Sequence, residues 1–245
     1  MSNKTTRSDI QKGPQRTPTE QSSRTGEIQA FLKKANALAK AKPPGSGRLL
    51  FALDATMSRQ PTWDTACHLQ GEMFREVVDI GTLDIQLVYF RGLSECRASK
   101  WVQDGQTLAG MMSRITCQGG HTQIGRALKH AIAETKRKKI DAVVFIGDSM
   151  EENADDLCML AGELGMRKVP AFMFQEGRDS VAEATFRELA RLTNGAFCRF
   201  DEGSAKQLGE LLRAVAVYAA GGYKALVAYG SKGGNGGQKL LEQMR

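Results

Sequence analysis

Residues 48–58 read RLLFALDATMS, an apolar run that ends abruptly in an aspartate and two hydroxyl side chains. A second run of the same kind, AVVFIGD at 142–148, also ends in an aspartate. Continuous apolar runs of this length are typical of strands that are covered on both faces, as in parallel sheets. Because the carboxyl ends of parallel strands meet at one edge of a sheet, we expect the polar residues at these two ends to lie together.

Short apolar runs and longer stretches of helical periodicity alternate through most of the chain. This alternation predicts a doubly wound α/β domain with a mostly parallel sheet, helices on both faces and one antiparallel edge strand. The expected strands are 48–54, 83–90, 95–101 (the edge strand), 142–147, 169–175 and 196–200. The expected helices are 62–80, 106–115, 122–138, 155–166, 180–193 and 204–218.

The positive charge of the chain is concentrated at its N-terminus. Residues 1–48 contain ten Lys or Arg and three acidic residues, which accounts for the whole net charge of +7, and the rest contains 24 of each sign. Residues 1–24 are polar and almost free of large apolar side chains, so we expect a disordered basic arm. The expected organisation is this arm, an amphipathic helix and linker at 25–45, the α/β domain at 46–220 and a Gly-rich tail at 221–245.

Several classes of protein are disfavoured by simple features of the sequence. No apolar run approaches the roughly 18 residues of a membrane-spanning helix. The first residues, MSNKTTRSDI, lack the apolar segment of a signal peptide. The odd number of dispersed cysteines, without a C-x-x-C pair, argues against a disulfide scaffold or a structural zinc site. We therefore expect a cytoplasmic protein with reduced thiols at positions 67, 96, 117, 158 and 198.

The polar residues at the strand ends and helix starts form an all-oxygen set. Asp54, Thr56 and Ser58 alternate after the first apolar run, so that their side chains can point to one side of an extended loop. Thr122 stands at the start of an expected helix, and Asp148 ends the strand at 142–147. Carboxylate and hydroxyl oxygens are the ligands that hard divalent cations prefer.

The order Asp-x-Thr-x-Ser, a separate Thr and a separate Asp resembles the metal-ion-dependent adhesion site of von Willebrand factor A (vWA) domains of the soluble intracellular bacterial type. The family more often has Ser at the position of Thr56. The resemblance implies that Thr56 and Ser58 contact the ion directly, that Thr122 does so in one conformation, and that Asp54 and Asp148 act largely through water. It also implies Mg²⁺ as the ion, with Mn²⁺ or Ca²⁺ as alternatives.

By the same resemblance, an acidic side chain of a protein partner completes the coordination of the ion. Soluble bacterial members of the family often work beside MoxR-type AAA+ ATPases or in stress responses, which implies an adaptor or assembly factor. The candidate residues of the partner-binding rim are Met57, Arg59, His121 and Glu151. The acidic residues at 151–156 would make this rim negative, or they cap the helix that begins after them.

Two other functions compete with the metal-dependent one. In the first, the domain is a scaffold and its basic arm binds nucleic acid or an anionic membrane. In the second, more remote one, GHTQIGRA at 120–127 is a phosphate-binding loop of a nucleotidase, although Arg126 and Ala127 replace the Lys and the hydroxyl of that motif. No nucleophile stands with a partner base in any pattern that we recognise, so we expect a protein that is not an enzyme.

Overall fold

The computed structural model describes residues 47–60, 63, 83–200, 209, 212–217, 219 and 228. The expected arm, the helix at 25–45 and the tail lie outside these residues, apart from residue 228 in the tail. Most of the expected helices at 62–80 and 204–218 also lies outside them. Among the described residues, no helix is both long enough and apolar enough to cross a bilayer.

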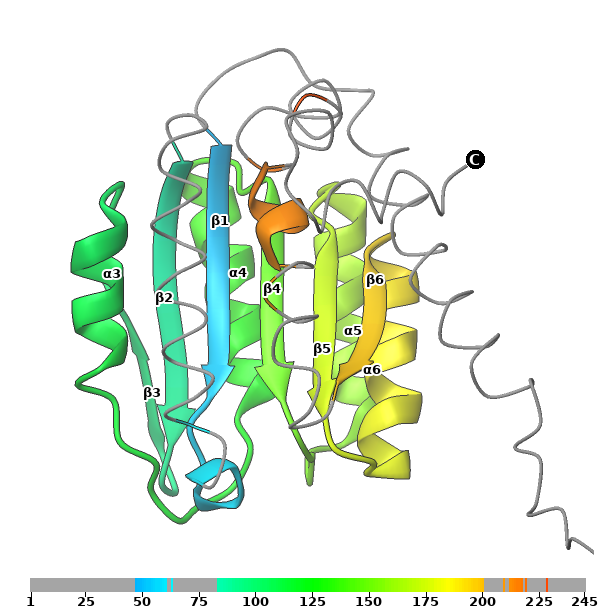
Figure 1. Cartoon of the computed structure of the whole chain (residues 1–245). Helices are drawn as coiled ribbons and strands as arrows, with labels where there is room; N and C mark the ends of the chain where they lie inside the picture. The colour runs from blue at the N-terminus through cyan, green and yellow to red at the C-terminus, as the bar shows by residue number, and fades with distance from the viewer. Residues whose placement is uncertain are drawn as a thin grey trace, which may run out of the picture.

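In the described part of the chain, six strands form one sheet in the order β3-β2-β1-β4-β5-β6 (Figure 1). All neighbouring strands pair in parallel except β2 and β3, which are antiparallel. The strands are β1 (Gly47–Asp54), β2 (Leu83–Arg91), β3 (Glu95–Ala98), β4 (Ala142–Gly147), β5 (Ala171–Glu176) and β6 (Ala196–Phe200). The predicted mostly parallel sheet with one antiparallel edge strand is therefore confirmed.

The two faces of the sheet contribute to two separate hydrophobic cores. Along β1, the side chains of Leu49, Phe51 and Leu53 enter one core, and those of Leu50 and Ala52 enter the other. This alternation follows from the two-residue period of a strand and explains why β1 is apolar at almost every position. Burial on both faces fixes the register of β1 and with it the position of Asp54 at its end.

Helices cover both faces of the sheet, as Figure 1 shows. The helices α4 (Ile124–Arg137), α5 (Ala154–Met166) and α6 (Ser180–Leu192) pack on one face, and α3 (Gly105–Met112) packs on the other together with Leu212 and Val215. Local side chains begin three of these helices: Asp104, Asn153 and Asp179 accept hydrogen bonds from the first turns of α3, α5 and α6. The start of α4 has no such local cap.

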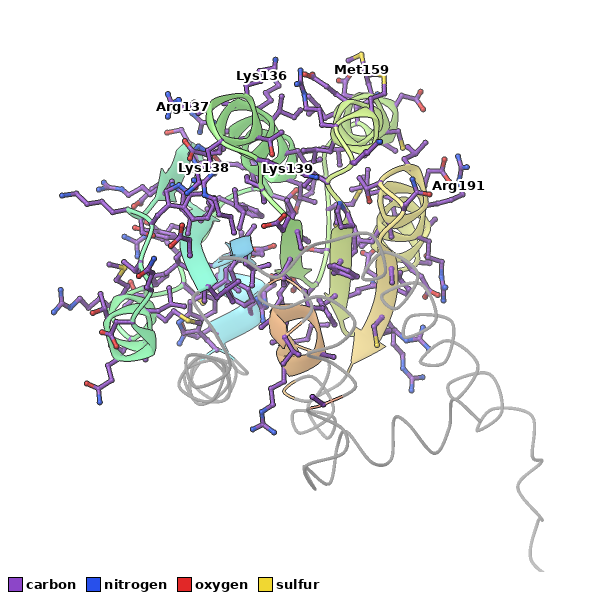
Figure 2. All side chains as sticks on the ribbon, turned by 90° about the horizontal axis from the view of Figure 1, so that it is seen from above. Lys136, Arg137, Lys138, Lys139, Met159 and Arg191 are labelled. Atoms are coloured by element: carbon purple, nitrogen blue, oxygen red, sulfur yellow. The ribbon has the colours of Figure 1, made fainter. Side chains whose placement is uncertain are left out.

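The basic cluster Lys136–Lys139 ends α4 at the end of the sheet opposite the carboxyl ends of the parallel strands (Figure 2). Its position is fixed by Arg48 at the start of β1, whose guanidinium donates to the carbonyl of Lys138. Lys136 pairs with Glu163 at 3.1 Å and Lys138 with Asp84 at 3.7 Å. Cations also suit the negative end of a helix dipole, so these contacts favour a structural role for the cluster.

Candidate metal centre

Asp54 is fully buried at the carboxyl end of β1, where the order of the strands reverses between β1 and β4. Its Oδ1 accepts a hydrogen bond from the backbone N–H of Thr56 at 2.8 Å. Its Oδ2 is also buried and has no hydrogen-bond partner among the described residues. Burial raises the pKa of Asp54 to about 6, because the ionised form is poorly solvated there.

The first loop of the site, residues 54–58, follows β1 directly. The hydroxyls of Thr56 and Ser58 lie 3.1 Å apart in this loop, which shows that the alternate positions do point to the same side. Thr56 is buried, whereas Ser58 is exposed in the short 3₁₀ turn η1 (Met57–Arg59). The loop therefore presents two neighbouring hydroxyl oxygens next to the buried carboxylate of Asp54.

The second loop, residues 117–123, runs alongside the first. The N–H of Gln118 donates to the carbonyl of Ala55 at 3.1 Å, and Thr56 and Gln118 form a parallel bridge. On its other side this loop touches the β2–β3 turn: a Cβ added to Gly120 would lie 2.0 Å from the carbonyl oxygen of Gly92. Only a residue without a side chain permits this approach, which brings the loop and its Thr122 to the site.

The third loop, residues 148–153, follows β4, the neighbour of β1. Leu53 pairs with Ile146 across the two strands, so that Asp54 and Asp148 follow at adjoining strand ends. A Cβ added to Gly147 would lie 3.4 Å from the Cβ of Asp54. The negative charge of Asp148 is close enough to contribute to the raised pKa of Asp54, after the larger effect of burial.

Thr122 joins the second loop to the third through Glu151. The backbone N–H and the hydroxyl of Thr122 both donate to Oε2 of Glu151, at 2.9 and 3.0 Å. The N–H of Glu151 donates in turn to the Thr122 hydroxyl at 3.1 Å. The second loop thus contacts both the first and the third, and these two follow neighbouring strands of the sheet.

The acidic residues at 151–156 divide between two helices. Asp155 and Asp156 occupy the first turn of α5, and their N–H groups donate to Oδ1 of Asn153, as the capping interpretation predicts. The carboxylates of Glu151 and Glu152 instead accept hydrogen bonds from backbone N–H groups at the start of α4. Glu151 accepts from Thr122, and Glu152 accepts from Gly125 at 2.9 Å. The sequence held one clue to this: glutamine, here at position 123, is a poor N-terminal cap, so α4 needs acceptors from elsewhere.

The prediction that Arg59 lies on the partner-binding rim is wrong for this structure, in which the residue as a whole is only 1% exposed. Its Nε donates to Oε2 of Glu176 at 2.9 Å, and its Nη1 donates to the carbonyl oxygen of Asp54 at 3.0 Å. These two acceptors draw the guanidinium inward, where it ties the first loop to the end of β5. The other proposed rim residues, Met57, His121 and Glu151, are exposed.

The donors at this site suit a hard divalent cation. Two carboxylates and three hydroxyls are available from Asp54, Asp148, Thr56, Ser58 and Thr122. No group of three or more His, Cys, Asp or Glu side chains gathers as a metal cluster anywhere in the described part of the chain. A buried carboxylate oxygen without a hydrogen-bond partner is costly unless something positive faces it, and a cation held by Asp54 would meet that need.

The fold is that of von Willebrand factor type A domains. The chain is similar to a von Willebrand factor type A protein from Catenulispora acidiphila, with 16% identity, a TM-score of 0.58 and coverage of 72% of this chain and 43% of that one. It is also similar to the SpRpn10 VWA domain, with 11% identity, a TM-score of 0.55 and coverage of 73% and 98%.

A third similar structure is proximal thread matrix protein 1 from the mussel byssus, solved with a zinc-occupied MIDAS motif. It has 16% identity and a TM-score of 0.58, with coverage of 71% of this chain and 46% of that one. The chain thus spans less than half the length of the Catenulispora and mussel chains. No protein-family model matches the sequence, and no curated protein matches it.

Proposed function

We propose that this chain is a protein–protein interaction module that depends on a divalent metal ion, with the ion held by Asp54, Thr56, Ser58, Thr122 and Asp148. The observation that carries the proposal is the buried Oδ2 of Asp54, which has no hydrogen-bond partner among the described residues. It lies in a loop with two hydroxyls 3.1 Å apart and next to the strand that delivers Asp148. A solved structure of the same fold with a zinc-occupied MIDAS motif supports this assignment.

The chemistry of the donor set supports binding of a partner's acidic side chain. When bound, a divalent cation supplies the positive charge that attracts a further anionic ligand. Asp54 and Asp148 balance its charge, and the hydroxyls of Thr56 and Ser58 add neutral donors on one side. Ser58, Met57 and His121 are exposed, so a partner carboxylate has access from the loop side of the sheet. We propose Mg²⁺ as the ion because the donors are all oxygens.

The contacts at the start of α4 favour this function over nucleotide binding. A phosphate-binding loop needs its backbone N–H groups free to hold the phosphates. Here the N–H groups of Ile124 and Gly125 donate to the carboxylate of Glu152, and Arg126 donates to Gln123 and to the carbonyl of Ser94. A carboxylate in the position of a phosphate opposes nucleotide binding. We therefore propose that the chain binds a protein partner and has no catalytic role.

For the partner, we propose a protein that presents an Asp or Glu side chain to the ion. The family resemblance favours an adaptor or assembly factor in the cytoplasm, and an AAA+ ATPase of the MoxR type is its first candidate partner. The acidic residues Glu151, Asp155 and Asp156 are exposed beside the site and repel an acidic surface as a whole. The partner is therefore expected to offer an isolated acidic side chain in neutral or basic surroundings.

The experiment compares wild type, Asp54→Ala and Asp156→Ala, a control that removes an exposed carboxylate near the site. Calorimetric titration with Mg²⁺ and Mn²⁺ should show binding to wild type and to the control, and none to Asp54→Ala. Capture from a native lysate, with Mg²⁺ or with EDTA, should then yield a partner only with a metal-competent protein and only with Mg²⁺. Equal metal binding by Asp54→Ala, or a partner indifferent to EDTA, contradicts the proposal.

A further inference from the structure

Glu151 lies outside the five-residue motif, yet it makes three hydrogen bonds with one member of that motif. Its Oε2 accepts from the N–H and from the hydroxyl of Thr122, and its own N–H donates to that hydroxyl. The residue as a whole is exposed, so its carboxylate reaches from the surface onto a threonine that is only 4% exposed. Such a two-way contact fixes the hydroxyl of Thr122 in both position and orientation.

The hydrogen-bonding capacity of a hydroxyl shows what this contact does. A threonine hydroxyl has one hydrogen to donate and two lone pairs with which to accept. In Thr122 the hydrogen is directed to Glu151 Oε2 at 3.0 Å, and one lone pair accepts from Glu151 N–H at 3.1 Å. One lone pair of Thr122 is left over from these bonds, and its direction is set by the other two. A cation ligand needs that lone pair and needs the hydrogen turned away from the ion.

We propose that Glu151 is a positioning residue of the metal site: it accepts a hydrogen bond from the Thr122 hydroxyl and so aims the remaining lone pair at the cation. This inference rests on the proposed function and deepens it. A carboxylate that accepts from a ligand also makes that ligand a better donor, and such contacts typically change metal affinity by about 10–100-fold. Thr122 needs a partner from another loop to orient its hydroxyl. Thr56 does not, because its hydroxyl lies 3.1 Å from that of Ser58 within its own loop.

The contacts of Asp155 and Asp156 distinguish these two acidic residues from Glu151. The carboxylate of Glu152 accepts from the N–H groups of Ile124 and Gly125, and the Thr122 side chain also contacts it. Asp155 and Asp156 are exposed in the first turn of α5, and their N–H groups donate to Asn153. A general effect of negative charge would be shared by Asp155 and Asp156, whereas an effect through the Thr122 hydroxyl would not.

The test measures Mn²⁺ and Mg²⁺ affinity by calorimetry on the full chain and its variants. Glu151→Ala should lower the affinity by about 10–100-fold, Glu151→Gln, which keeps an acceptor oxygen, should lower it less, and Asp155→Ala should change it by less than about twofold. A double-mutant cycle then separates positioning from charge. In a Thr122→Ala background, Glu151→Ala should have almost no further effect, because the hydroxyl that it positions is absent.

The outcomes distinguish failure of the positioning role of Glu151 from failure of the proposed metal-binding function. If wild type binds metal and Glu151→Ala binds it equally well, the inference is overturned and the proposed function stands. If Asp155→Ala is as damaging as Glu151→Ala, or if Glu151→Ala is as damaging without the Thr122 hydroxyl, Glu151 acts through its charge alone and the positioning role is wrong. If wild type binds neither ion, the proposed function fails together with this inference. Melting temperatures in EDTA identify any variant that is simply unfolded.

Discussion

At the scale of single residues, the most unusual group in the domain is the buried carboxylate of Asp54. Burial raises its pKa to about 6 from an ordinary value of 3.8, and Asp148 adds to this, whereas bonds to Thr56 and the charge of Arg59 oppose it. A protein without metal therefore holds Asp54 in an environment that disfavours its charge. The free energy needed to ionise this buried carboxyl group is consistent with a site that serves a cation rather than the stability of the fold.

This has a consequence for stability that depends on pH. Between pH 3.8 and about 6 the folded protein keeps Asp54 protonated while the unfolded chain has lost the proton. Because a raised carboxyl pKa disfavours the ionised native state, stability without metal should fall as pH rises through this window, by about 3 kcal/mol in all. Urea unfolding of wild type and Asp54→Asn in EDTA, from pH 4 to 7, measures the difference.

In Asp54→Asn, this part of the pH dependence should disappear. Addition of Mg²⁺ to wild type should oppose the loss, since the ion stabilises the ionised carboxylate and binds more tightly above pH 6 than below it. A wild-type protein whose stability, relative to Asp54→Asn, rises between pH 4 and 6 in EDTA would contradict this account of Asp54.

At the scale of elements, the site depends on how closely the second loop approaches the β2–β3 turn. The N–H of His121 donates to the carbonyl of Gly92 at 3.2 Å, and Gln123 Nε2 donates to the same carbonyl at 3.3 Å. Gly120 lies against the backbone of Gly92 with no room for a Cβ. These contacts hold the loop on both sides of Thr122, so they set the position of this proposed ligand.

Gly120→Ala should therefore damage both the fold and the site. The added methyl group would lie 2.0 Å from a backbone oxygen, so the loop or the turn must move, at a cost of about 1–3 kcal/mol. Metal affinity should fall as Thr122 is displaced. The adjacent Gly119→Ala is the matched control, because no atom lies within 4 Å of a Cβ at that position. Unfolding and calorimetry on both variants test this, and equal behaviour of the two would refute it.

The elements of the domain were largely predictable, because strands buried on both faces leave long apolar runs in the sequence. The placement of Asp54 and Asp148 at adjoining strand ends was predictable for a related reason, since the carboxyl ends of parallel strands share one edge of the sheet. The contacts of Glu151 and Arg59 were not predictable. Each joins segments far apart in the chain, Glu151 to Thr122 and Arg59 to Glu176, and a spacing pattern has no information about such pairs.

At the scale of the whole molecule, Arg59 and Glu176 link the first loop to the end of β5, two strands away from β1 in the sheet. β4 lies between β1 and β5, so this ion pair spans strands that do not touch. Both side chains are largely buried, at 0% and 11% exposure, and the guanidinium also holds the carbonyl oxygen of Asp54. A buried pair of this kind stabilises little by itself, but the loss of one partner leaves the other charge stranded.

Arg59→Met should accordingly destabilise the protein by about 3–5 kcal/mol, because Glu176 loses its counter-ion. The double variant Arg59→Met/Glu176→Gln should recover part of this loss, since no charge is then left buried. Urea denaturation of wild type, both single variants and the double variant gives the coupling energy. A double variant that is less stable than Arg59→Met, or additive single effects, would show that the pair is not what holds this region together.

The same ion pair bears on when a newly made chain completes the proposed metal site. The ribosome releases β1 and the first loop early, but Glu176 belongs to β5 and is made much later. Until then the hydrogen bond from Arg59 to Glu176 is unable to form, so the loop that it anchors lacks one of the contacts that hold it. On the proposed function, a nascent chain that ends before β5 should bind the ion less tightly than the finished chain does. Any contact that depends on the ion should then form only once most of the sheet has been synthesised.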